Sequence, residues 1–288
     1  MDRIKIKDVN LLLLIIFLLT QFAETPLFDF FMIIVIFTWL SKNNLNLRNF
    51  LYFSKTNTSI ILLSVLTAVL LVFASFFYYF YSASSIESIG ERKLSLSLSF
   101  LWSIFVASVL GPLVEELFFR GILYNSYKKK GFLLAIILSS TFFFLIHFNY
   151  RKITIFIIGV YLALLYEITQ CFWIPVLVHG SYNAFASVFF ALTARFLQVF
   201  LYWLYTDNVW FFRIKLLLIS IVLYILAILV MLLIMRISGN NIFQGKEFKN
   251  MKLINRDDSE PLIDKYLILV FVISVSMIAV RIVFFKPV

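Results

Sequence analysis

Apolar stretches long enough to cross a bilayer recur along this chain, and they constrain its fold more than any other feature. A transmembrane helix needs about 20 apolar residues, and a backbone in lipid must satisfy its polar groups internally. The sequence therefore predicts an all-α fold, a polytopic transmembrane helical bundle in a cell membrane. The segments that predict spans are 9–22, 27–41, 58–82, 97–127, 131–149, 153–172, 174–196, 210–236 and 265–285.

We expect eight or nine spans, because the first two segments are short. Glu24-Thr25-Pro26 between them fits either a tight hairpin or a kink in one long element. With nine spans, most Lys and Arg residues outside the apolar segments fall on the side of the amino terminus. Basic loops stay on the cytosolic side of a membrane, so we expect a cytosolic amino terminus and a multi-pass protein.

Composition argues against a soluble protein that binds nucleic acid. The formal net charge is +10, but the basic residues stand in short loops beside apolar runs. Hydrophobic residues make up 62% of the chain, whereas a soluble domain has about 45 to 50% apolar residues. We therefore expect the lipid bilayer, and no nucleic acid, as a partner, while the oligomeric state stays unknown.

The polar connections and the single cysteine carry less information. Residues 237–264 form a long polar loop of mixed charge, and 84–96 is either a solvated loop, which we favour, or a short interfacial helix. The basic start resembles a signal peptide, but further apolar segments follow at once, which favours a retained signal anchor. Cys171 has no partner for an intramolecular disulfide, and we expect it to be small apolar filling.

Ionisable side chains inside the apolar segments indicate a functional site. Such residues cost roughly 2.5 to 3.5 kcal/mol each in a membrane, so they are functional candidates by default. The only two histidines, His147 and His179, and the adjacent glutamates Glu115 and Glu116 all lie in apolar stretches. Together with Asn183, they predict a hydrated catalytic site within the bilayer.

Helical spacing divides the roles of the two glutamates. Gly111-Pro112 predicts a helix start, which would put both glutamates near a helix amino terminus. Glu116 and Arg120 are four residues apart, within reach of an ion pair. Glu115 points about 100° away from Glu116. We therefore expect Glu116 and Arg120 to neutralise each other, and Glu115 to face substrate or water.

The two histidines can share one site only if they lie at a similar depth in the membrane. His179 and Asn183 are four residues apart, so one helix face carries both, and an amide donor there can hold an oxyanion. His147 lies near the end of segment 131–149. The next apolar run, 153–166, gives only about 21 Å of helix. We therefore expect Tyr150-Arg151-Lys152 to lie in a water-filled cavity, which would bring the histidines to a similar depth.

These motifs, in this order, resemble the CPBP family of intramembrane proteases. The family includes CAAX prenyl endopeptidases and bacterial enzymes linked to bacteriocin immunity and peptide maturation. The resemblance covers about residues 100–190. It is carried by EExxxR from Glu115 to Arg120, FxxxH from Phe143 to His147 and HxxxN from His179 to Asn183, with flanking matches at Phe119-Arg120-Gly121 and Ile174-Pro175.

The resemblance implies an intramembrane endopeptidase, a hydrolase that acts on a peptide or a lipidated protein. Glu115 and His147 would activate a water for attack on the peptide carbonyl. His179 and Asn183 would then stabilise the oxyanion.

The resemblance leaves the cofactor open. The family admits a metal-free mechanism, which we favour. If a single divalent metal such as zinc takes part, Glu115, His147 and His179 are the expected ligands.

The remaining residues and segments receive supporting roles. By the same resemblance, Glu116 and Arg120 would orient the glutamate helix. Glu167 has no catalytic partner, and we expect a packing or cavity residue. The predicted divisions are amino-terminal transmembrane helices over 1–95, a catalytic CPBP-like helical core over 96–196, and carboxy-terminal transmembrane helices over 197–288 with the polar loop.

Two other functions stay possible from the sequence. A non-catalytic membrane protein, such as an immunity factor or scaffold, would bind a peptide without cutting it. A transporter would use the acids and histidines as a proton relay, but the chain shows no paired inverted halves. Cleavage that depends on Glu115 and His147 would separate the protease from both.

Overall fold

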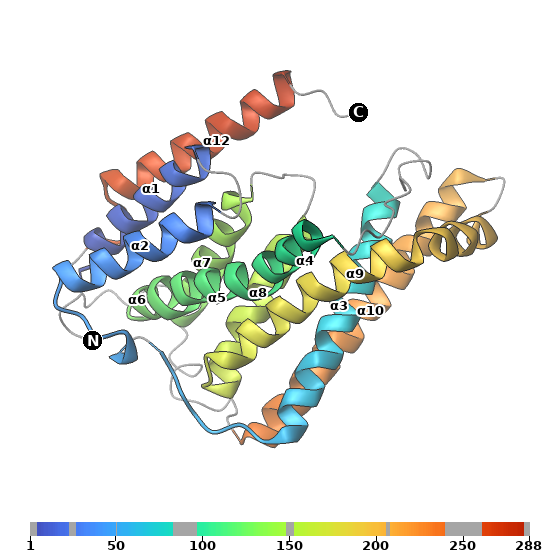
Figure 1. The fold of residues 1–288 in the computed structure, drawn as a ribbon, viewed down its shortest axis with the longest axis horizontal. Helices are drawn as coiled ribbons and strands as arrows, with labels where there is room; N and C mark the ends of the chain where they lie inside the picture. Colours follow the sequence, from blue (N-terminus) through green and yellow to red (C-terminus); the bar gives the residue numbers. More distant parts are fainter. Residues whose placement is uncertain are drawn as a thin grey trace. The chain divides into compact units, whose positions relative to one another are not determined.

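The residues that the structure describes fold almost entirely into helices (Figure 1). The computed structural model describes residues 5–22, 27–49, 51–82, 97–147, 153–205, 208–239 and 261–284. Over these residues the β structure is one isolated bridge, between Phe53 and Cys171, and the all-α prediction is confirmed. The long helices are α1 (Ile6–Phe22), α2 (Leu27–Lys42), α3 (Thr58–Ser82), α7 (Phe132–Ile146), α8 (Ile153–Thr169), α9 (Trp173–Leu204), α10 (Val209–Ser238) and α12 (Lys265–Phe284).

One further helix is built from five parts with alternating geometry. It runs without a break from Leu98 to Lys128. Its parts are α4 (Leu98–Phe105), the π-helical η3 (Val106–Leu110), α5 (Gly111–Glu116), the π-helical η4 (Leu117–Tyr124) and α6 (Asn125–Lys128). A short 3-10 turn, η1 (Leu47–Asn49), precedes α3.

Packing divides the chain into two compact units made of interleaved stretches. Unit 1 comprises 1–54, 113–172 and 241–288, and unit 2 comprises 55–112 and 173–240. The division into three consecutive regions, made from the sequence, stays a prediction.

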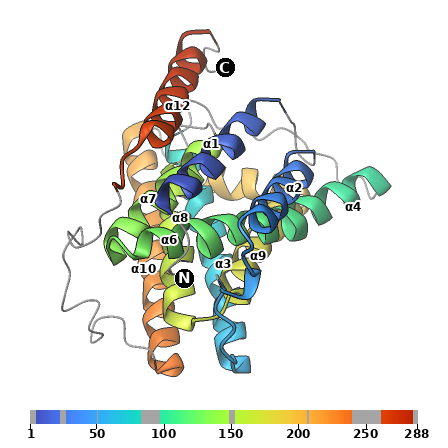
Figure 2. The same cartoon turned by 90° about the vertical axis from the view of Figure 1, so that its left-hand side faces the viewer.

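In unit 1, the first and last described helices pack together. Helix α1 lies beside α12 and α2, and α7 packs against α8, α6 and η4 (Figures 1 and 2). The ring of Phe142 on α7 contacts a ring on each of these helices. Its centroid lies 6.2 Å from that of Phe17 on α1 and 5.4 Å from that of Phe271 on α12. Asn10 on α1 also links α6 to the residues before α12. It accepts a 2.6 Å hydrogen bond from the Tyr127 hydroxyl and donates to the Leu262 carbonyl.

A polar network joins α6, α8 and the segment before α3 within unit 1. Lys128 pairs with Glu167 at 2.7 Å, and the Tyr124 hydroxyl donates to the other oxygen of that carboxylate. The Tyr166 ring stacks on Tyr52 with centroids 4.9 Å apart. Glu167 is therefore a structural ion-pair residue, which agrees with its expected packing role. Cys171 is buried here, as expected of small apolar filling.

In unit 2, α3 packs against α9 and α10 around a core of aromatic side chains. The opposite face of α10 is apolar and exposed: Leu218, Val222, Ile225 and Leu229 are each 50 to 55% exposed. These residues recur at helical spacing along one stripe, as expected of a helix face that meets lipid. The buried core residues are Phe76, Phe77, Phe80, Leu201, Phe212 and Leu216.

The helices follow the predicted segments closely. Thr58–Ser82, Leu98–Lys128 and Val209–Ser238 are long and apolar enough to cross a membrane, and Phe132–Ile146, Ile153–Thr169 and Lys265–Ile278 are shorter apolar helices. The number of spans stays a prediction. Four expectations fall outside the described residues: those for Glu24-Thr25-Pro26, for 84–96, for Tyr150-Arg151-Lys152 and for most of the polar loop 237–264.

Candidate active site

The helix that carries the two glutamates does not begin at Pro112, so that prediction is wrong. The helix continues through Gly111 and Pro112 because it widens just before them: the Gly111 N–H donates to the Val106 carbonyl, five residues back. Such a register accommodates a proline, which has no N–H for the usual bond and whose ring crowds the carbonyl four residues earlier. The glutamates therefore lie in a helix interior, where the dipole effect of a first turn does not reach.

The predicted ion pair between Glu116 and Arg120 is confirmed. Nη1 of Arg120 lies 2.9 Å from Oε1 of Glu116, and both side chains are fully buried. Nη2 of Arg120 donates to the Gly159 carbonyl on α8 at 2.9 Å. A Cβ at position 159 would lie 3.2 Å from the backbone of Ser140. Glycine therefore lets α8 approach α7 closely.

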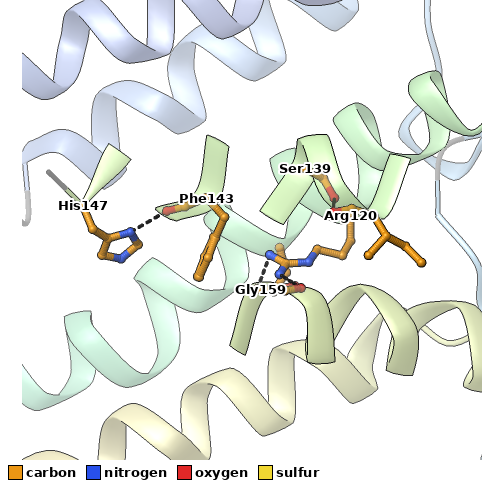
Figure 3. Close-up of polar contacts among 7 residues, drawn as sticks. Arg120, Ser139, Phe143, His147 and Gly159 are labelled. Carbon is orange, nitrogen blue, oxygen red and sulfur yellow. Dashed lines mark hydrogen bonds and ion pairs between the residues drawn. The ribbon is translucent and has the colours of Figure 1, made fainter. Parts of the chain in front are cut away.

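Phe143 stands between the buried arginine and the first histidine (Figure 3). The guanidinium carbon of Arg120 lies 4.7 Å from the centroid of the Phe143 ring, within the range of a cation–π contact. The His147 ring packs against the same phenyl ring, with centroids 5.0 Å apart. The Glu116–Arg120 pair is thus in contact with the residue that supports His147.

The surroundings of His147 fix the position of its proton. Nδ1 lies 2.7 Å from the Phe143 carbonyl oxygen, one helical turn back. A carbonyl can only accept, so Nδ1 must carry a hydrogen, and a neutral ring then has its lone pair on Nε2. His147 is exposed at the end of α7. The side chain is therefore arranged to accept a proton at Nε2.

Glu115 differs from its neighbour in exposure. Its side chain is partly exposed, whereas Glu116 is completely buried. Glu116 is thus hydrogen-bonded to the arginine inside unit 1, whereas Glu115 is partly exposed, with its Oε2 atom buried. The exposure agrees with the division of roles that helical spacing predicted.

His179 and Asn183 lie one turn apart on α9 in unit 2, as predicted. His179 is 5% exposed, and Asn183 is partly exposed. The Asn183 side chain donates from Nδ2 to the Ala107 carbonyl at 2.7 Å. Between these two residues, Gly180 faces the Ser108 carbonyl so closely that a Cβ would overlap the oxygen. These contacts hold α9 directly against η3.

Sequence reasoning indicated one of three further partners in these two sets of residues and missed the other two. Gly159 accepts from Arg120, Phe143 lies between Arg120 and His147, and Ala107 accepts from Asn183. Phe143 was visible as the first residue of its motif. Gly159 and Ala107 contribute only backbone carbonyls. Every residue has such a carbonyl, so the residue type does not indicate this role.

The six candidate residues divide between the units. Glu115, Glu116, Arg120 and His147 belong to unit 1, and His179 and Asn183 belong to unit 2. Among the described residues, no three side chains of His, Cys, Asp or Glu gather into a group that can hold a metal. The zinc ligand set of Glu115, His147 and His179 therefore stays a prediction, as does the convergence of the catalytic residues.

Comparisons with known proteins match this part of the chain. Residues 97–185 match the family model described as type II CAAX prenyl endopeptidase Rce1-like, a range that contains all six candidate residues. No solved structure gives a match to the chain.

Two curated relatives are membrane proteins. YdiL of Bacillus subtilis strain 168, provisionally named a membrane peptidase, is 32% identical over 87 residues, which cover 30% of this chain and 36% of YdiL. The membrane-embedded CAAX protease MroQ of Staphylococcus aureus strain USA300 is 29% identical over 126 residues, which cover 41% of this chain and 51% of MroQ. The match thus spans about a third to a half of the length of these relatives.

Proposed function

We propose that this chain is a membrane-embedded endopeptidase of the CPBP family, because residues 97–185 match the Rce1-like CAAX prenyl endopeptidase model and the two relatives are named as a membrane peptidase and a CAAX protease. Its substrate is a peptide or a lipidated protein held at the membrane, and its nucleophile is a water. The enzyme acts within the bilayer, as a CPBP-type hydrolase.

The observation that carries the proposal is the unequal environment of the two adjacent glutamates. Glu116 is buried and neutralised by Arg120, while the preceding residue, Glu115, is partly exposed. A structural pair alone needs one carboxylate. A second carboxylate at the edge of an apolar helix carries a cost in lipid, and a role as general base accounts for it.

His147 supports the same reaction through its hydrogen bond. With Nδ1 donating to the Phe143 carbonyl, the neutral ring accepts at Nε2. In the proposed mechanism, Glu115 and His147 take the proton of the water as its oxygen attacks the peptide carbonyl. The proton then passes to the leaving amine, so that one water divides between the two products.

His179 and Asn183 stabilise the tetrahedral intermediate in this proposal. An asparagine amide has two N–H groups, and one of them donates to the Ala107 carbonyl. That bond orients the amide plane, and the second N–H is the donor proposed for the oxyanion. Removal of one such donor typically costs a factor of about 10² to 10³ in kcat.

The proposal predicts that Glu115→Gln and His147→Ala each abolish proteolysis. The substrate is unidentified, so the measurement compares the peptides in membranes from cells that produce the wild-type chain or a variant. Peptides that accumulate with the wild type but not in cells that lack the chain are the products. We expect both variants to reach wild-type amounts in the membrane and to release none of these peptides.

Glu167→Gln is the matched control, because it makes the same change to a glutamate of unit 1 that pairs with Lys128 outside the motifs. Products that persist with Glu115→Gln would refute the catalytic role of Glu115, and a biological effect that persists without products would favour a peptide-binding protein. The same comparison after chelation and zinc addition separates the metal-free reaction from the zinc alternative.

A further inference from the structure

The acceptor of the Asn183 amide is a helix carbonyl that its own helix cannot satisfy in the local register. In η3 the bonds run from an N–H to the carbonyl five residues back, as the Gly111 N–H to the Val106 carbonyl shows. In that register, the next carbonyl, of Ala107, faces residue 112. Residue 112 is proline and has no N–H to donate. Asn183 supplies the donor instead, at 2.7 Å.

The backbone around this bond is built for close approach. Gly180, one turn before Asn183, lies against the Ser108 carbonyl, and any side chain there would overlap that oxygen. The face of α9 that carries His179 and Asn183 thus packs directly on the carbonyls of η3. All of these residues belong to unit 2.

We propose that Pro112 is a positioning residue for Asn183: by withholding an N–H from the Ala107 carbonyl, it keeps this acceptor for the Asn183 amide and sets the direction of the second Asn183 N–H. The inference rests on the proposed function, in which that second N–H meets the oxyanion. With alanine at position 112, a backbone N–H competes for the carbonyls of η3. The Asn183 side chain then loses its fixed orientation.

The first test reads the hydrogen bond without any substrate. In detergent micelles, protein labelled with ¹⁵N-asparagine gives a side-chain amide signal for Asn183, which the spectrum of Asn183→Ala identifies by its loss. We expect Pro112→Ala to shift this signal and to speed exchange of its hydrogen-bonded proton with solvent. Pro261→Ala removes a proline outside this helix and should leave the signal unchanged. An unchanged signal in Pro112→Ala would overturn the inference.

The second test is a double-mutant cycle on proteolysis. Membranes that contain the wild type, Pro112→Ala, Asn183→Ala or both changes are compared for the rate at which the wild-type products accumulate. We expect Pro112→Ala to slow release by about tenfold or more, and the double variant to be no slower than Asn183→Ala, because residues acting through one contact are not additive. A double variant whose rate falls by the product of the two single-variant factors would contradict the proposal.

The melting temperature of Pro112→Ala separates a positioning role of Pro112 from a general loss of folded structure. Proline in a helix interior is unfavourable compared with alanine, so Pro112→Ala should melt no lower than the wild type while it cleaves more slowly. A lower melting temperature together with slower cleavage would indicate a structural role and overturn the inference. If Asn183→Ala cleaves at the wild-type rate, the oxyanion role in the proposed function fails, whereas the amide signal still tests the positioning.

Discussion

The neighbouring glutamates Glu115 and Glu116 differ in burial, because Glu116 is fully buried and Glu115 is partly exposed. Burial of a charge is costly unless the charge is paired and hydrogen-bonded. Arg120 meets this need for Glu116 at 2.9 Å, and its other contacts, with the Gly159 carbonyl and the Phe143 ring, hold the guanidinium in place. The ion pair therefore connects α5 and η4 to both α7 and α8.

At the residue scale, Glu116→Gln is expected to destabilise the protein strongly. The change removes the carboxylate that forms an ion pair with the buried Arg120, and breaking a buried pair in this way costs about 3 to 5 kcal/mol. The free energy of unfolding in detergent micelles measures the loss. The Glu116→Gln and Arg120→Gln double variant should recover part of it.

Glu167→Gln is the control for that measurement, because the Lys128 side chain is 18% exposed and its ammonium can turn toward water. Glu167→Gln should therefore lower the free energy of unfolding clearly less than Glu116→Gln does. Equal losses for Glu116→Gln and Glu167→Gln would contradict the special role assigned to the buried pair.

The sequence predicted the local contacts of these residues and missed the distant ones. Glu116 and Arg120 are four residues apart, so helix geometry alone indicated their contact. The Arg120 bond to Gly159 joins residues 39 positions apart, and no local pattern encodes such a pairing. The bond from Asn183 to Ala107 joins residues 76 positions apart and reaches a π-helical turn that the sequence pattern did not indicate.

At the scale of elements, close helix packing depends on glycine. Gly180 brings α9 against η3, and Gly159 brings α8 against α7. The predicted segments located these helices well, because twenty-residue apolar runs leave few alternatives. The interruption at Pro112 was misread: Gly-Pro is a common helix boundary, but a π-helical turn lets the helix continue through it.

Gly180→Ala is therefore expected to be far more damaging than Gly121→Ala. The new Cβ at 180 would overlap a backbone oxygen that cannot move alone, and overpacking of this kind costs roughly 1 to 3 kcal/mol or more. At 121 the nearest atom, 2.7 Å from the ideal Cβ, is the end of the flexible Leu51 side chain, which can rotate away. The measurement is the melting temperature of each variant in micelles, and we expect a clearly lower value for Gly180→Ala. Similar values for the two variants would contradict this account.

At the scale of the whole molecule, several contacts gather chain segments at one end of unit 1. Hydrogen bonds and ion pairs there connect α1, α6, α8, the segment before α3 and the residues before α12. The nine-span count assigns all of these positions to the cytosolic side. The residues concerned are Asn10, Tyr52, Lys128, Glu167 and Leu262. Their proximity agrees with the predicted alternation of the spans.

Reporter fusions test the topology directly. With nine spans and a cytosolic amino terminus, a fluorescent protein at the amino terminus should be active inside, and alkaline phosphatase at the carboxyl terminus should be active outside. With eight spans, both reporters would lie inside. An amino-terminal reporter on the outer side would contradict the orientation that the basic residues predict.

The pairing of α1 with α12 also has a consequence for how the protein is made. Helix α1 leaves the ribosome first, and α12 is the last of the described helices to follow. Asn10, whose partners include the Leu262 carbonyl, must wait for that stretch to be translated. During synthesis, the packing of unit 1, to which Glu115 and His147 belong, is therefore completed only after α12 has been translated.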